Sequence, residues 1–473
     1  MYDCTKNYIN GKWLSSEVND IHDIINPATE ESIGQVAYGT ADDVNLAVAA
    51  ARTAFEEFSQ WTVEQRLELL AKIEETYMAR YSDMAGAITA EMGAPVTLSQ
   101  KAQAASGVGH LRSTIAALQA MELEEQLGNS IILKEPVGVC GLITPWNWPI
   151  NQIVCKVAPA LAAGCTVVLK PSEIAPVNAT IFAEILDAAG VPAGVFNLVH
   201  GDGPGVGSAM SAHPGIDMMS FTGSTRAGIL VAKSAADTVK RVSQELGGKS
   251  ANIILESAPL EEAIKSGVID MFGNTGQSCN APSRMLVPES LYEQAVAIAA
   301  AVAEHVQPGD PQDPATHLGP VVSEAQYNKI QGLIEKGMAE GAGLVCGGPG
   351  KPEGLETGYF VKPTIFRDVN NDMAIAREEI FGPVLVMIPY SDIDQAIEIA
   401  NDTDYGLSGY VYGASTGEAM AVARRLRTGM VHLNGADNDI NAPFGGYKQS
   451  GNGREWGAHG IEDFLELKAV MAA

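Results

Sequence analysis

The sequence is short of positive charge. Its 473 residues carry 30 Lys and Arg against 57 Asp and Glu, which gives a formal net charge of −27. Nucleic acids and anionic membrane surfaces are bound through clustered Lys and Arg side chains, so this balance argues against both kinds of partner. We therefore expect an acidic, repulsive surface with no nucleic-acid or membrane partner.

The sequence also lacks cysteine pairs. Its six cysteines are scattered and none belongs to a C-x-x-C pair, which is typical of reduced thiols in a cytoplasm. The eight histidines are dispersed as well, and no set of Cys and His has the spacing of a zinc site. We expect a cytoplasmic protein with no disulfide framework and no metal centre.

Long apolar runs are absent too. The longest strictly apolar run covers residues 295–303, which is too short to cross a bilayer. The first residues, MYDCTKNYINGKW, are polar and show no signal-peptide pattern. Apolar residues make up 46% of the chain and are evenly spread, which argues against disorder. A chain of this length predicts two or three globular domains, at roughly 100–200 residues each.

Two nucleotide-binding signatures are incomplete. Residues 201–207, GDGPGVG, look like a dinucleotide loop, but Val206 stands where the fingerprint requires glycine. Residues 247–250, GGKS, resemble the end of a P-loop, but Ser243 stands where the first glycine is needed. We predict that residues 201–207 form a turn that opens a helix, and we expect no P-loop ATPase.

Strands and helices alternate along the middle of the chain. Thr40 precedes a helical pattern with one apolar face, and helical pattern continues to about Met92. Short apolar runs at 166–170, 195–199, 218–221 and 251–255 then alternate with helical stretches, which predicts a parallel sheet covered on both faces. A second α/β stretch begins near Ala258, where Ser290–Glu293 has the form of a capping box that opens a helix. Ligands of parallel sheets bind beyond the carboxyl ends of the strands.

Two further strands are predicted away from these sheets. Residues 129–136 form a short segment that contains β-branched residues and is flanked by turn formers. Residues 464–471 form an apolar stretch near the C-terminus. Neither closes an obvious sheet of its own. We interpret them as strands that pair between subunits.

Three motifs carry residues suited to catalysis. In TPWNWPI, prolines flank Asn147, and an amide held rigidly in this way can donate to a developing oxyanion. In SQELGGKS, Glu245 precedes two glycines, and a carboxylate in a mobile loop suits a general base. In NTGQSCNAPSR, small neighbours leave room for a substrate beside Cys279, whose attack requires a thiolate with a lowered pKa. A structural Asn, a solvated Glu and an inert Cys remain the alternatives.

Two more motifs suggest a nucleotide cofactor. In FTGSTRAG, a strand ends at Phe221, Gly223 permits a tight turn, and Ser224 can cap a helix whose free N–H groups attract a pyrophosphate. In LKPSE, Lys170 and Glu173 follow a predicted strand and could bind ribose hydroxyls. A carboxylate there would repel a 2′-phosphate, which favours NAD over NADP. A plain turn and an exposed loop are the alternatives.

These motifs occur together in one order: TPWNWP, LKPSE, FTGSTRAG, ELGGKS, GQSCNA, EEIFGPV and PFGGYKQSGNGRE. The series resembles the NAD(P)-dependent aldehyde dehydrogenase superfamily over nearly the whole chain. The resemblance implies an α/β fold with a Rossmann-like parallel-sheet cofactor domain, an α/β catalytic domain and a bridging β-flap. We expect the NAD-binding domain at 1–117 and 137–247, the catalytic domain at 248–450, and the oligomerisation and bridging segment at 118–136 and 451–473.

The resemblance also implies roles for the matching residues. Cys279 would be the nucleophile, Glu245 the base that activates water, and Asn147 with the backbone N–H of Cys279 the oxyanion hole. Lys156 and Glu455 would lie near the proton path. The implied cofactor-binding residues are Thr144, Pro145, Trp146, Lys170, Ser172, Glu173, Phe221, Gly223, Ser224, Leu246, Gly247, Glu379 and Phe381. The implied substrate-channel residues are Trp148, Asn151, Ser278 and Asn280.

The implied activity is NAD-dependent oxidation of an aldehyde to the carboxylic acid, with NADP as the second candidate cofactor. The route runs through a cysteine thiohemiacetal and a thioester that Glu-activated water hydrolyses. The presence of Glu245 favours this route over transfer of the acyl group to coenzyme A. The alternatives are a semialdehyde or betaine-aldehyde specialist of the same family and a non-catalytic structural relative. The expected assembly is a homodimer or a homotetramer.

Overall fold

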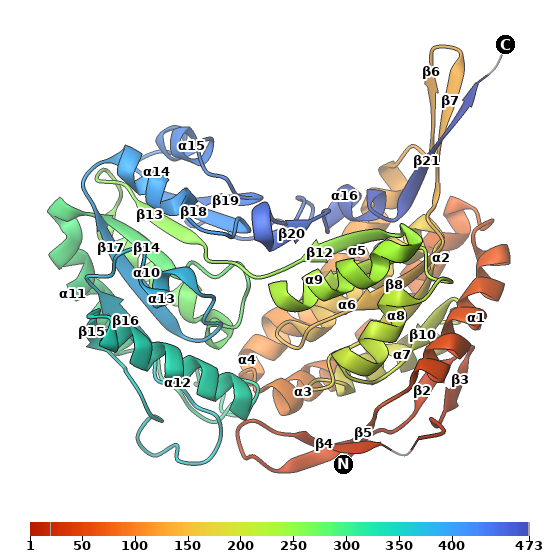
Figure 1. Ribbon diagram of the computed structural model, residues 1–473, viewed down its shortest axis with the longest axis horizontal. Helices are drawn as coiled ribbons and strands as arrows, with labels where there is room; N and C mark the ends of the chain where they lie inside the picture. The colour runs from red at the N-terminus through yellow and green to blue at the C-terminus, as the bar shows by residue number, and fades with distance from the viewer. Residues whose placement is uncertain (19, 472–473) are drawn as a thin grey trace.

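A computed structural model describes residues 1–18 and 20–471 of the chain. Two large sheets, each covered by helices, form the two lobes of the molecule, and a small sheet projects from one corner (Figure 1). The N-terminal strands run along the base of the molecule. The mixed α/β architecture with parallel sheets confirms the predicted fold class.

An eight-stranded sheet forms the centre of the first lobe, with the strand order β20-β12-β11-β8-β9-β10-β2-β3. Its five central strands run parallel, and its edge strands are antiparallel. The parallel strands are short and almost fully buried, as expected when helices cover both faces. The strands are β2 (Asn7–Ile9), β3 (Lys12–Leu14), β8 (Val139–Ile143), β9 (Thr166–Lys170), β10 (Phe196–Leu198), β11 (Met218–Thr222), β12 (Arg241–Glu245) and β20 (Gly451–Asn452).

Helices predicted from the sequence cover this sheet. The predicted N-cap Thr40 accepts a hydrogen bond from the Asp43 N–H and opens α1 (Ala41–Phe58), whose apolar stripe is buried. Asp202 caps the short π-helical turn 203–207, so the expected turn in that segment is confirmed. The other helices of this lobe are α2 (Val63–Ala79), α3 (Tyr81–Met92), α4 (Val96–Leu98), α5 (Ala104–Ala120), α6 (Pro149–Ala163), α7 (Val177–Ala188), α8 (Ser208–Ala212) and α9 (Thr225–Ala235).

A seven-stranded sheet forms the centre of the second lobe, with the order β15-β16-β17-β14-β13-β18-β19. The predicted strand at 251–255 is β13 of this sheet, so it does not extend the first one. The strands are β13 (Ala251–Ile254), β14 (Arg284–Pro288), β15 (Gly343–Cys346), β16 (Thr364–Arg367), β17 (Val384–Tyr390), β18 (Ser408–Tyr412) and β19 (Met430–Leu433). The helices are α10 (Leu260–Phe272), α11 (Tyr292–Ala303), α12 (Glu324–Ala339), α13 (Ala374–Arg377), α14 (Ile393–Asn401) and α15 (Thr416–Ala423).

The capping box predicted at Ser290–Glu293 is wrong. Residues 289–291 form a 3₁₀ turn, and α11 begins at Tyr292 with no side-chain cap. The Ser290 hydroxyl donates to the Glu256 carboxylate at 2.9 Å instead. The Ser290 side chain therefore binds Glu256, which is distant in the sequence, and does not cap α11.

The two isolated strands predicted from the sequence pair with each other. β7 (Ser130–Pro136) and β21 (Leu465–Met471) are antiparallel along their whole length, and β6 (Glu124–Leu127) completes a three-stranded sheet. This sheet projects from the molecule (Figure 1). It therefore forms within one chain, without a second copy. A separate sheet joins β1 (Tyr2–Cys4), β5 (Ser32–Ala37) and β4 (Ile21–Ile25), and the short α16 (Gly457–Glu462) precedes β21.

Across residues 1–18 and 20–471, none of the helices is both long enough and apolar enough to span a membrane.

Candidate active site

Three neighbouring parallel strands end at one cavity. β8, β11 and β12 lie side by side, and the segments that follow them contribute Asn147, Gly223 and Gly247 to the lining. The second lobe contributes Cys279 from the segment before β14, and Glu379 and Phe381 from the segment before β17. The cavity has a volume of about 200 Å³. It lies where carboxyl ends of parallel strands predict a ligand site.

Cys279 belongs to a segment that side chains from the first lobe hold in place. The Asn147 amide donates to the Gln277 carbonyl at 2.9 Å, and the Trp148 indole N–H donates to the Ser278 hydroxyl at 2.8 Å. Gly248 packs so closely on this segment that a Cβ at that position would lie 2.2 Å from the Cys279 carbonyl oxygen. The thiol, partly exposed, lines the cavity.

The electrostatics of Cys279 differ from the expectation of a lowered pKa. Removal from bulk water raises the pKa of the Cys279 thiol, and the carboxylates of Glu379 and Glu245 raise it further. The Cys279 backbone N–H acts in the opposite direction, but burial and the carboxylates outweigh it and the pKa of the thiol is raised. The local sequence could not show this, because both carboxylates come from distant segments.

Asn147 is fixed through both ends of its residue. Its side chain is buried, and its backbone carbonyl accepts hydrogen bonds from the Gln103 amide at 3.0 Å and the Asn274 amide at 2.9 Å. Asn274 and Gln103 also contact each other at 3.2 Å. A buried polar network thus holds the amide nitrogen of Asn147 next to the segment that contains Cys279, and a preorganised donor requires such a fixed position.

Glu245 ends β12, so its placement in a mobile loop is wrong. Its backbone pairs with Thr222 of β11 and Gly451 of β20, and its side chain is 2% exposed. Residues 241–245 read as polar, but two neighbouring strands satisfy the backbone and keep the segment in the sheet. Neither carboxylate oxygen has a hydrogen-bond partner among the described residues. Burial raises the pKa of Glu245 well above its ordinary value, and the charge of Glu455 adds to the effect.

Lys156 and Glu455 form a buried ion pair beside Glu245. The Lys156 ammonium contacts the Glu455 carboxylate and donates to the Ser220 hydroxyl at 3.0 Å. Burial acts to lower the pKa of Lys156, but Glu455, Cys155 and Glu245 together outweigh burial and the pKa is raised. The structure therefore brings together the two residues that the sequence placed 299 positions apart.

Residues 13–470 match the family described as "Aldehyde dehydrogenase family". The chain belongs to the aldehyde dehydrogenase family. A 3-succinoylsemialdehyde-pyridine dehydrogenase of Pseudomonas sp. is 57% identical over 472 residues, which cover 100% of this chain and 99% of the relative.

Solved structures of the family have the same fold. A mutant of aldehyde dehydrogenase C from Pseudomonas syringae, complexed with NAD+ and octanal, is 51% identical and superposes with a TM-score of 0.98, covering 99% of this chain and 96% of that one. The Mycobacterium tuberculosis aldehyde dehydrogenase complexed with NAD+ is 41% identical with a TM-score of 0.97, covering 100% and 98%.

The cofactor residues implied by the aldehyde dehydrogenase family fall into two groups. Those that line the Cys279 cavity are Pro145, Trp146, Gly223, Ser224, Leu246, Gly247, Glu379 and Phe381. Glu379 accepts a hydrogen bond from the Gly248 N–H at 2.9 Å. The Trp146 and Phe381 rings pack edge to face, with their centroids 5.4 Å apart. Ser224 caps α9 as expected, by accepting from the Ala227 N–H.

The second group lies outside this cavity. Its members are Thr144, Lys170, Ser172, Glu173 and Phe221. Lys170 ends β9, donates to the carbonyls of Pro171 and Gly201, and lies 3.3 Å from Glu173. Burial lowers the pKa of Lys170. Lys170, Ser172 and Glu173 lie at and just beyond the carboxyl end of β9, the strand next to β8, where an extended cofactor would continue.

The implied channel residues Trp148, Asn151, Ser278 and Asn280 are not among those that line the Cys279 cavity. Trp148 and Ser278 bind each other, and the Asn151 amide oxygen contacts the His110 ring. The Asn280 carbonyl accepts from the Tyr410 hydroxyl at 3.0 Å. The channel residues are thus partly engaged with one another and with buried neighbours.

Sequence reasoning missed three residues of the cavity, Thr222, Gln326 and Lys329. Gln326 lies on α12 and donates to the Phe381 carbonyl at 2.7 Å, which fixes that aromatic residue in a backbone conformation with φ of +61°. Nothing in the sequence around α12 marks a site, because its residues meet the cavity only through the packing of the second lobe.

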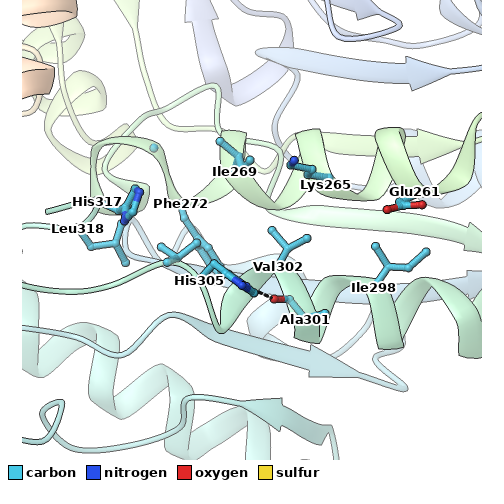
Figure 2. A pocket seen from close by; sticks show the side chains of 12 residues that line it. Glu261, Lys265, Ile269, Phe272, Ile298, Ala301, Val302, His305, His317 and Leu318 are labelled. Atoms are coloured by element: carbon cyan, nitrogen blue, oxygen red, sulfur yellow. Dashed lines mark hydrogen bonds between the residues drawn. The ribbon is translucent and has the colours of Figure 1, made fainter. Parts of the chain in front are cut away.

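A separate groove lies between α10 and α11 (Figure 2). It has a volume of about 610 Å³ and is lined mainly by apolar side chains such as Ile269, Phe272 and Val302. Lys265, His305 and His317 also face it. It shares no lining residue with the Cys279 cavity, so it is not part of the site described above.

Proposed function

We propose that the protein oxidises aldehydes to carboxylic acids with NAD, through a covalent adduct on Cys279. The observation that supports this most is the meeting of Cys279, Asn147, Glu245 and Glu379 at one cavity, although they come from four separate segments. A structural relative without activity would have no need of this arrangement.

The first step is addition of the Cys279 sulfur to the aldehyde carbon. The carbonyl oxygen becomes an oxyanion, for which the Asn147 amide and the Cys279 backbone N–H are the donors. Loss of one such donor costs about 2.7–4 kcal/mol of transition-state stabilisation. Burial and neighbouring carboxylates raise the pKa of the thiol, so its proton must leave before or during attack, and the carboxylate of Glu245, which lines the same cavity, is the proposed acceptor.

Glu245 then serves the second half of the reaction. It removes a proton from the water that hydrolyses the thioester. The covalent intermediate in this way divides one difficult reaction into two easier steps. Neither of its oxygens has a hydrogen-bond partner among residues 1–18 and 20–471, so a rotation of the side chain toward the sulfur would break no hydrogen bond to these residues. The Lys156–Glu455 pair next to it provides a buried route for the proton.

The cavity residues fit a nicotinamide cofactor. One carboxylate oxygen of Glu379 binds the Gly248 N–H, and the other is available to accept hydrogen bonds from ribose hydroxyls. Phe381 and Trp146 offer apolar ring faces. When bound, NAD supplies the acceptor for the hydride that leaves the adduct. Glu173 disfavours a 2′-phosphate, which supports NAD over NADP. NAD+ complexes of relatives up to 51% identical support the same choice.

The aldehyde itself is proposed only as a class. The relative complexed with octanal supports an aliphatic aldehyde, and the 57% identical pyridine semialdehyde dehydrogenase supports a larger ketone-bearing semialdehyde. We also propose a homo-oligomer, either dimer or tetramer, in a cytoplasm. Exposed apolar side chains on α9 and on the projecting sheet support the oligomer, and six free cysteines support the cytoplasm.

The replacement Cys279→Ala tests the covalent route. We expect it to lower aldehyde oxidation by about a thousandfold or more, while NAD still quenches the fluorescence of Trp146 in the cavity. Cys346→Ala is the matched control, because Cys346 is also a free and partly exposed thiol but lies on β15, outside the cavity. Activity retained in Cys279→Ala would refute the proposal.

A further inference from the structure

The carbonyl that follows the nucleophile is held by a buried tyrosine. The Tyr410 hydroxyl, on β18, donates to the Asn280 carbonyl at 3.0 Å. Tyr410 is 8% exposed. Burial raises the pKa of Tyr410, so the hydroxyl keeps its proton and remains a donor over the working range of pH.

The nucleophile segment is otherwise anchored from the opposite lobe. Asn147 and Trp148 hold Gln277 and Ser278, which precede Cys279. Tyr410 holds the residue after it, from the second lobe. Cys279 therefore has an anchored residue on each side, and these anchors restrain its backbone.

The tyrosine ring is itself oriented. Tyr410 and His432 are directly opposed on the neighbouring strands β18 and β19, and their rings are stacked with centroids 4.5 Å apart and planes inclined by 12°. The His432 ring is fixed in turn by a contact of 2.9 Å between Nδ1 and the Ala436 carbonyl. Ring stacking of this kind restricts the direction in which the phenol hydroxyl points.

We propose that Tyr410 is a positioning residue for the reaction: its hydroxyl fixes the Asn280–Ala281 peptide, one peptide bond beyond Cys279, and so restrains the backbone that carries the sulfur and the Cys279 N–H. Tyr410 acts through the Asn280 carbonyl and touches neither substrate nor cofactor in this role. His432 acts one contact further away, by orienting the phenol. This inference rests on the proposed nucleophilic role of Cys279.

The same strand supplies a matched control. Tyr412 lies two residues further along β18 and is likewise buried, and its hydroxyl donates to the Ser266 hydroxyl on α10 at 2.7 Å. Each of the variants Tyr410→Phe and Tyr412→Phe removes one buried hydroxyl from the same strand, β18. Only the first removes a hydrogen bond to the nucleophile segment.

We expect Tyr410→Phe to lower kcat about three- to tenfold, the range that loss of one hydrogen bond implies, with KM for NAD unchanged. Iodoacetamide should alkylate Cys279 at least threefold more slowly across pH 6–10, measured by mass spectrometry of the Cys279 peptide. In Tyr412→Phe, both rates should stay within twofold of the wild type, while the melting temperatures of the two variants fall by similar amounts.

A wild-type kcat or a wild-type alkylation rate in Tyr410→Phe would overturn the inference, and so would equal losses in Tyr412→Phe. The alkylation rate reports on the position of the sulfur whether or not Cys279 is the nucleophile. Failure of the covalent route would show separately, as activity retained in Cys279→Ala.

Discussion

At the residue scale, the site depends on acidic side chains whose pKa values their surroundings raise. Burial raises the pKa of Glu245 and of Glu379, and both carboxylates raise the pKa of Cys279. A general base works best with a pKa near the working pH, which a raised carboxyl approaches. Burial and negative charge around the cavity therefore raise the pKa of both Glu245 and the Cys279 thiol.

Glu245→Gln removes the base and keeps the size of the side chain. We expect kcat to fall by about 10²–10⁴-fold, the usual contribution of general base catalysis, while an acyl adduct accumulates on Cys279. Intact-mass measurement after addition of aldehyde and NAD would show the adduct. Glu378→Gln is the control, because Glu378 is adjacent to the site residue Glu379 but exposed.

The absence of an acyl adduct in Glu245→Gln would contradict the water-activating role. A raised pKa means that Glu245 ionises only above the ordinary carboxyl range. Thioester hydrolysis in the wild type should therefore become faster as the pH rises above the ordinary carboxyl range.

At the element scale, α7 begins without a side-chain cap of its own, and a residue of α3 supplies one. Glu91, fully buried, accepts from the Val177 N–H at 2.6 Å and from the Asn178 N–H at 2.9 Å. Burial outweighs these hydrogen bonds and raises the pKa of Glu91 to about 7. No local pattern near α7 predicts this cap, because the acceptor lies 86 residues earlier in the chain.

The Glu91 carboxyl should make stability depend on pH. Its pKa is about 7 in the folded protein and about 4.3 when unfolded, so the folded state binds the extra proton between these values. The stabilisation is complete below the unfolded pKa and is lost as the pH rises through about 7. We expect Glu91→Gln, which does not titrate, to melt below the wild type at pH 5 and to approach it by pH 8. A constant difference in melting temperature would contradict this.

Prediction of elements succeeded where the pattern is local. The strands at 166–170 and 218–221 and the helix after Thr40 were predicted from runs of apolar residues and one capping residue, and the structure confirms them. β12 was missed because its residues are polar, and the cap at Ser290 was wrong because a distant carboxylate binds that hydroxyl. In both cases a tertiary contact overrode the local preference.

At the scale of the whole molecule, α9 and the projecting sheet each expose more than one large apolar side chain. On α9, Ile229 and Leu230 are 46% and 56% exposed, and on the projecting sheet Leu127 and Leu467 are 62% and 71% exposed. A protein with a formal charge of −27 repels its copies over most of its surface. Burial of apolar patches between two copies of the chain would offset this repulsion. We therefore expect these two patches to lie at the contacts of the proposed oligomer.

Leu230→Lys tests this expectation. A charge placed at an apolar contact would have to be buried without a partner, so the variant should shift toward smaller species in light scattering coupled to size-exclusion chromatography. Met338→Lys on α12 is the control, since Met338 is 43% exposed and lies outside both patches. An unchanged assembly in Leu230→Lys would show that α9 is not a contact.

The sequence by itself determined the family, the α/β class and the identity of Cys279, Glu245 and Asn147 as candidates, because ordered motifs and apolar periodicity are properties of short segments. Only the tertiary structure decided that Glu245 ends a buried strand beside the Lys156–Glu455 pair, that the thiol stands among carboxylates, and that Gln326 and Tyr410 support the site. These features come from contacts between segments far apart in the chain, and burial and charge at such contacts depend on packing that no short stretch of sequence contains.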